Sequence, residues 1–165
     1  MEEKFLHEEE RGAEKSSRFP AKQDLSKKLA SKSFADFDVA KLKGNTFGTD
    51  EKLKSKKTID KLFKEGKSVS QSGFTLVYFI GALNSVYPAQ AGFTVPKKHF
   101  KLAVDRNHIK RLIREAYRLN KGVIYEKLAA CKQQMALMFV FKGKVVPNHE
   151  MVAKSVTACL NEIKI

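Results

Sequence analysis

The sequence predicts an α+β domain in which helices pack on a four-stranded sheet, and three features indicate this fold class. Short apolar runs typical of strands lie at residues 74–80, 89–95 and 135–141. A long segment from residue 106 repeats apolar residues every three or four positions, which is the period of an amphipathic helix. Shorter segments with a helical period precede the first run and follow the last. The predicted order is therefore α-β-β-β-α-β-α, where the first strand is a brief one around Val69.

The first helix is expected between residues 50 and 66. Thr49 or Asp50 is placed to cap it, because a side-chain oxygen at a helix start accepts a bond from a free backbone N–H. Gly66 is placed to end it. Lysines occupy most of its other positions. Its apolar positions are Leu53, Ile59, Leu62 and Phe63.

The next strands are separated by a turn-rich connection. Residues 81–88 contain Gly, Asn, Ser and Pro, which predicts a hairpin between the strand at 74–80 and a return strand at 89–95. Ala91, Phe93 and Val95 alternate along the return strand, so they share one face. Pro96 ends it.

The long central helix is expected to be capped by Asp105 and to run past Gly122, because the helical period continues through Leu128. The most apolar run, residues 135–141, predicts a buried strand. Residues 147–150 then begin a last helix. The central helix has one apolar stripe, formed by Ile109, Leu112, Ile113, Ala116 and Tyr117.

A row of cations runs along another face of this helix. The row, which we call the basic ridge, consists of Arg106, Lys110, Arg114 and Arg118, with Asn107, Arg111 and Lys121 beside it. Like charges four residues apart cost a few tenths of a kcal/mol each in an isolated helix. An anionic partner along the ridge would reverse that cost. A solvated charged face is the alternative, but four cations in register favour a phosphate-binding surface, without distinguishing DNA from RNA.

The net charge of +14 is concentrated in the second part of the chain. Residues 1–44 hold 10 Lys/Arg and 9 Asp/Glu, which gives +1, and residues 45–165 hold 22 and 9, which gives +13. Such a basic domain most often meets nucleic acid, and less often an anionic membrane surface. Residues 1–45 are rich in charge and serine without a sustained period, so we expect a disordered or loosely structured extension before a domain at 46–165.

No signal peptide or membrane span is expected from the sequence. Cys131 and Cys159 are interpreted as reduced thiols of a cytoplasmic protein. The four histidines and two cysteines lack metal-ligand spacing, and neither a phosphate-cradling glycine loop nor a nucleophile motif is present. His99 and His108 lie in the basic region, but we interpret them as polar contacts to the backbone or a base of a nucleic acid rather than as a catalytic acid and base.

Two motifs resemble the bacterial ribonuclease P protein subunit. The denser is Ala103-x-x-Arg106-Asn107-His108-Ile109-Lys110-Arg111-x-x-Arg114, in which only His108 departs from the family, which usually has Arg there. The other is the run from Leu53 to Gly66, which is similar to the opening of the family's domain and includes Ile59, Leu62 and Phe63. The resemblance covers about residues 46–165.

The resemblance implies a compact sandwich with a left-handed βαβ crossover, like the second domain of a small-subunit ribosomal protein. It also implies that this protein binds the catalytic RNA subunit and the 5′ leader of precursor tRNA, while the RNA performs the cleavage. Magnesium would be held mainly by that RNA, with Asn107 helping to position it. No DNA or membrane partner is expected.

The residues that the resemblance implies for RNA contact are Arg106, Asn107, His108, Lys110, Arg111, Arg114, Arg118, Lys97 and Lys98. In the family the leader lies in a cleft between the sheet and the first helix. Its implied lining here is Ile59, Phe63, Phe74 and Val77. Because Ile59 and Val77 stand where aromatics are common, base stacking would be reduced, and Tyr78 or Phe79 could compensate.

Three alternatives stay open at this stage. The protein could be a structural RNA-binding protein of the ribosome-associated type, with no role in cleavage. A free-standing nuclease is a second possibility, although no carboxylate cluster favours it. Phe63 and Phe74 could also be ordinary core residues rather than leader contacts.

Overall fold

The computed structural model describes residues 46–83 and 85–165. The predicted N-terminal extension lies outside the described residues, so its expected disorder stays a prediction. The described elements follow the predicted order. They are α3 (Lys56–Glu65), β1 (Lys67–Gln71), β2 (Phe74–Ile80), β3 (Ala89–Thr94), α4 (Ala103–Ala130), β4 (Met135–Phe141) and α5 (His149–Asn161).

The strands form one mixed sheet in the order β1-β2-β4-β3. β2 pairs antiparallel with both β1 and β4, and β3 pairs parallel with β4. The predicted hairpin between β2 and β3 is therefore wrong, because β4 lies between them. β4 is the most apolar strand, with buried side chains on both of its faces. A strand of this kind is stabilised by a central position, where other elements cover both faces. The tight hairpin instead joins β1 to β2, where Ser72 and Gly73 both have positive φ.

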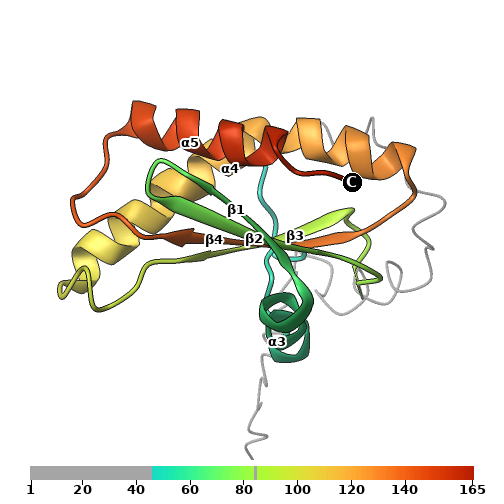
Figure 1. Ribbon diagram of the computed structural model, residues 1–165, viewed down its shortest axis with the longest axis horizontal. Coiled ribbons are helices and arrows are strands. Elements are labelled where there is room, and N and C mark those ends of the chain that lie inside the picture. Colours follow the sequence, from blue (N-terminus) through green and yellow to red (C-terminus); the bar gives the residue numbers. More distant parts are fainter. Residues whose placement is uncertain (1–45, 84) are drawn as a thin grey trace, which may run out of the picture. The chain divides into compact units, whose positions relative to one another are not determined.

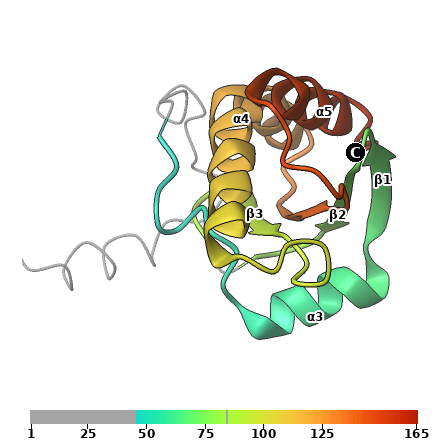
Figure 2. The same ribbon diagram turned by 90° about the vertical axis from the view of Figure 1, so that its left-hand side faces the viewer.

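Helices cover the two faces of the sheet unequally. In Figures 1 and 2, α4 and α5 lie together on one face and α3 lies alone on the other. We call the first the two-helix face and the second the α3 face. Alternate residues of each strand point to opposite faces. Buried strand residues on the two-helix face are Phe74, Leu76, Tyr78, Met135, Leu137, Phe139 and Phe141, whereas Ala136, Met138, Val77, Phe79 and Val140 belong to the α3 face.

Two helices begin at residues other than those expected. Ser55 caps α3 by accepting a bond from the Thr58 backbone N–H, so Leu53 lies before the helix rather than within it. Leu53 instead pairs its backbone with Ala91 of β3. The predicted caps at residues 49 and 50 are wrong, because residues 49–52 form a turn that leads into this pairing, and the helix starts only after it. Similarly, α4 begins at Ala103, so Asp105 lies in its first turn rather than at its cap.

The remaining boundaries agree with the sequence. Gly66 ends α3, α4 continues past residue 122, and Asn148 caps α5 through the Met151 backbone N–H at 2.8 Å. The β3-α4-β4 unit is a parallel crossover, and its left hand stays a prediction. None of the helices in the described ranges combines the length and the apolar character needed to cross a bilayer.

Candidate RNA-binding surfaces

The position of α4 explains why its cations line up. The helix buries one stripe of apolar side chains against the sheet and α5, which fixes its rotation about its own axis. The stripe in its first half consists of Ile109, Ile113, Ala116 and Tyr117. The basic ridge lies at the border of that stripe, on the side of edge strand β3, where the Arg114 guanidinium lies 5.9 Å from the centroid of the Phe93 ring.

The middle and the ends of the ridge differ. At one end, Arg106 Nη1 donates to the carbonyl oxygens of Phe100 and Lys101 at 2.8 and 2.7 Å, which fastens the loop before the helix. At the other end, the Arg118 guanidinium binds Glu115, with Nε 2.9 Å from Oε2. This hydrogen bond and ion pair hold the pKa of Glu115 below its usual value. Lys110 and Arg114 make no ion pair within residues 46–83 and 85–165, so the ridge's available charge lies at its centre.

Further exposed polar groups extend this surface. Asn107, His108 and Arg111 are exposed on the first half of α4, and Lys97 and Lys98 are exposed in the loop after β3. The structure thus places most of the residues predicted for RNA contact on one side of α4 or in the loop before it. His108 is the exception, because at 100° per residue it points about 160° away from Lys110. Arg106 and Arg118 also have internal roles.

A second loop adds cations that the sequence analysis missed. His99 Nδ1 lies 3.1 Å from the Gly143 carbonyl oxygen, so the loop after β4 is fastened beside the loop after β3. Lys142 and Lys144 in that loop are exposed. Lys142-Gly143-Lys144 directly follows the predicted strand at 135–141, but only the sheet order places it beside the β3–α4 loop, because β3 and β4 end as parallel neighbours.

Lys121 does not belong to the surface. Its side chain is only 5% exposed and forms an ion pair with Glu51, whose side chain is 2% exposed. Placing Lys121 beside the ridge was therefore wrong. Helical spacing alone could not reveal this, because the partner comes from a segment 70 residues earlier.

The α3 face holds some, but not all, of the predicted leader contacts. Ile59 and Val77 are partly buried in the same apolar cluster, and Phe63 is 55% exposed on α3. Phe74 is 1% exposed in the core of the two-helix face, so its inclusion with Val77 was wrong. Two residues three apart on a strand point to opposite faces, and this period was available from the sequence.

The two aromatics considered as replacements also separate. Tyr78 is buried on the two-helix face, whereas Phe79 belongs to the α3 face. Lys61 Nζ lies 4.8 Å from the centroid of the Phe79 ring. Positions 61 and 63 of a helix point about 200° apart, so Phe79 packs beside the flank of α3 away from Phe63. Phe63, the single aromatic of α3, is exposed on the other flank.

The described side chains offer little for metal chemistry. No group of three or more His, Cys, Asp or Glu side chains gathers in the part of the chain that the structure describes. Asn107 offers a single neutral amide oxygen, whereas proteins usually bind magnesium through one or two carboxylates, with waters and phosphates completing the octahedron. Residues 46–83 and 85–165 therefore do not form a magnesium site by themselves.

The fold and these surfaces define a class: a small α+β protein with an exposed cationic helix, a surface typical of proteins that bind polyanions. Comparison with known proteins narrows it. The family model described as Ribonuclease P matches residues 47–164. The ribonuclease P protein component of Porphyromonas gingivalis strain W83 is 32% identical over 120 residues, which cover 72% of this chain and 88% of that protein. That of Chlorobaculum tepidum is 37% identical over 109 residues, which cover 61% of this chain and 70% of that protein.

Solved structures agree in fold. The RNase P protein of Thermotoga maritima superposes with a TM-score of 0.56 and 24% identity, covering 68% of this chain and 97% of that one. The Staphylococcus aureus RNase P protein superposes with a TM-score of 0.54 and 21% sequence identity. The match covers 67% of this chain and 93% of that one. The chain therefore belongs to the ribonuclease P protein family.

Proposed function

We propose that this protein subunit of ribonuclease P binds the catalytic RNA through the basic ridge and the 5′ leader of precursor tRNA through the α3 face. The catalytic RNA would perform the cleavage and would hold most of the magnesium, with Asn107 helping to position it. The cytoplasm is the proposed location.

The observation that carries the proposal is the exposed cationic surface of α4 and its neighbouring loops. Lys110, Arg111 and Arg114 share it with Lys97 and Lys98, and the apolar stripe of α4 holds the helix rigidly behind them. Neutralising phosphates in this way releases counterions and gives affinity that depends on salt but little on sequence. Such a surface suits a large folded RNA, whose backbone presents many phosphates.

The α3 face supports the second part of the proposal. An exposed aromatic beside lysines is typical of single-strand binding, because any base can stack on the ring while the cations neutralise its phosphates. Phe63 supplies the ring, and Lys56, Lys57 and Lys64 are exposed on the same helix.

One assay tests the proposal against its alternatives. Precursor tRNA is incubated with magnesium and with the protein, the cognate catalytic RNA, or both, at physiological salt. We expect the protein to stimulate leader removal only when the catalytic RNA is present. Cleavage by the protein alone would make it a nuclease, and binding without stimulation would make it a structural RNA-binding protein.

A further inference from the structure

The segment before α3 is attached to the rest of the domain by its backbone. The Ala91 N–H donates to the Glu51 carbonyl oxygen at 2.8 Å, and the Leu53 N–H donates to the Ala91 carbonyl oxygen at 3.0 Å. This short pairing runs along edge strand β3, and Ser55 caps α3 immediately afterwards. The position at which α3 starts is therefore set by how residues 46–53 are held.

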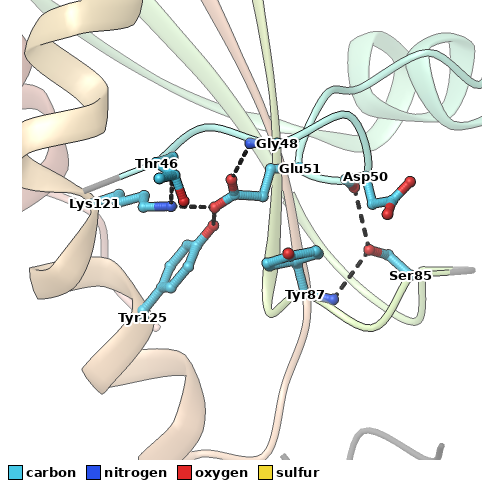
Figure 3. Close-up of polar contacts among 8 residues, drawn as sticks. All are labelled: Thr46, Gly48, Asp50, Glu51, Ser85, Tyr87, Lys121 and Tyr125. Carbon is cyan, nitrogen blue, oxygen red and sulfur yellow. Dashed lines mark hydrogen bonds and ion pairs between the residues drawn. The ribbon is translucent and has the colours of Figure 1, made fainter. Parts of the chain in front are cut away.

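A buried polar cluster holds that segment against α4. Figure 3 shows the Glu51 carboxylate pointing toward Lys121 and Tyr125 of the helix. The Tyr125 hydroxyl donates to Oε1 at 2.6 Å, and Lys121 Nζ binds the same oxygen. The other carboxylate oxygen accepts from the Gly48 N–H at 2.6 Å. Lys121 Nζ also donates to the Thr46 carbonyl oxygen. Glu51 thus has partners from both elements, and Lys121 binds the segment at two oxygens.

The Tyr125 hydroxyl stays protonated, which preserves its hydrogen bond to Glu51 and so the attachment of the segment to α4. Burial, with Tyr117 and Glu51 nearby, raises the pKa of Tyr125, so its hydroxyl remains a donor at physiological pH. Desolvated charges demand well-oriented partners, because a buried charge that loses its partner is strongly unfavourable. A hydrophobic contact would tolerate sliding of the segment, whereas this network fixes its register.

The same segment also supports the basic ridge. Phe47 lies edge-on to Phe93, with ring centroids 5.6 Å apart, and edge-on to Tyr117 at 5.7 Å. Phe93 is the ring beneath the Arg114 guanidinium. Residues 46–55 therefore contact the support of the ridge at one end and begin α3 at the other.

We infer that Glu51, Lys121 and Tyr125 are positioning residues, which hold the α3 face in a fixed arrangement relative to the basic ridge. This inference rests on the proposed function, in which the two surfaces bind the catalytic RNA and the leader. When one surface is engaged, a rigid link keeps the other at a high effective concentration for its own ligand. Loosening the link would therefore reduce the affinity gained from the leader and spare the affinity for the catalytic RNA.

The test uses Glu51→Gln and Tyr125→Phe in the full-length protein assembled with the catalytic RNA. Tyr125→Phe removes one hydrogen bond and keeps the ring, so it remains informative if Glu51→Gln fails to fold. The matched control is Val156→Ala, which removes part of a fully buried side chain from α5, a helix that packs against α4, β1 and β2. Three quantities are measured: the midpoint of thermal unfolding, the Kd for catalytic RNA, and the ratio of holoenzyme affinities for a precursor tRNA and the same tRNA without its leader.

We expect both cluster variants to reduce the leader-dependent ratio, by about tenfold for Glu51→Gln, with little change in the Kd for catalytic RNA. Val156→Ala should leave the ratio unchanged at a comparable loss of thermal stability. An unchanged ratio in folded cluster variants, or an equal loss in the control, would overturn the inference while leaving the proposed function intact. A wild-type holoenzyme that gains nothing from the leader would instead overturn leader binding itself.

Discussion

The two faces of the sheet have different compositions, although they are built from alternating residues of the same strands. The two-helix face is rich in large aromatic side chains, with Phe93, Tyr117 and Phe139 in mutual ring contact. The α3 face is smaller and mainly aliphatic, with partly buried Val77 and Val140. Two helices close the first face, and a single helix of ten residues crosses the second. The largest fully buried side chains of the strands lie on the two-helix face, so we expect that face to contribute most of the stability.

The largest expected effect is on folding. Phe139→Ala removes a fully buried ring and should lower the free energy of unfolding by about 3–5 kcal/mol. Val140→Ala, at the next position on the α3 face, should cost about 1 kcal/mol because its side chain is only partly buried. Chemical denaturation of both variants measures the difference. Equal losses would show that the two faces contribute alike to stability.

A binding effect should separate from stability on the α3 face. Phe63→Ala should change the free energy of unfolding by under about 0.5 kcal/mol, since the side chain is 55% exposed. It should weaken holoenzyme binding to precursor tRNA by about tenfold, within the range for loss of one stacked base. Phe63→Tyr should retain affinity. A similar loss for tRNA without a leader would argue against contact with the leader.

Two arginines of the basic ridge are expected to contribute differently to binding of the catalytic RNA. Arg114→Ala should weaken binding to the catalytic RNA and reduce the slope of log affinity against log salt by about 1. Arg118→Ala should change that slope less, because its guanidinium is already paired with Glu115. Titrations at several salt concentrations provide the slopes, with Lys154→Ala on α5 as a control cation. Identical slopes for Arg114→Ala and wild type would contradict the assignment of the ridge.

The smallest expected effect is on the reactivity of Cys159, a buried thiol of α5 on the two-helix face. Burial raises the pKa of the Cys159 thiol to about 11, and Glu162 adds to the shift. The thiolate is the reactive form, so Cys159 should resist alkylation in the folded protein at pH 8, whereas exposed Cys131 should react. Raising the pH toward 11 should increase labelling of Cys159. Peptide mapping measures both sites, and equal rates at pH 8 would mean that this face opens readily.

Local patterns in the sequence were sufficient for most elements. The runs at 74–80 and 135–141 coincide with β2 and β4, and the helical period correctly carried α4 past Gly122. The motif from Ala103 to Arg114 identified the family that the comparisons show. These features depend on spacing along the chain, so neighbouring residues suffice to define them. The opposite faces of Phe74 and Val77 follow from the same period of two and were predictable.

Only the tertiary structure decided which distant segments meet. It inserted β4 between β2 and β3, because the most apolar strand gains most from two covered faces. Residues 51–53 pair with β3, and α3 therefore starts later than expected, with Ser55 as its cap. The same arrangement buries Lys121 against Glu51. The helical spacing of a lysine is the same whether its side chain faces solvent or, like Lys121, pairs with a carboxylate 70 residues away in the sequence. That choice depends on burial and on pairing across the fold, which a one-dimensional period does not encode.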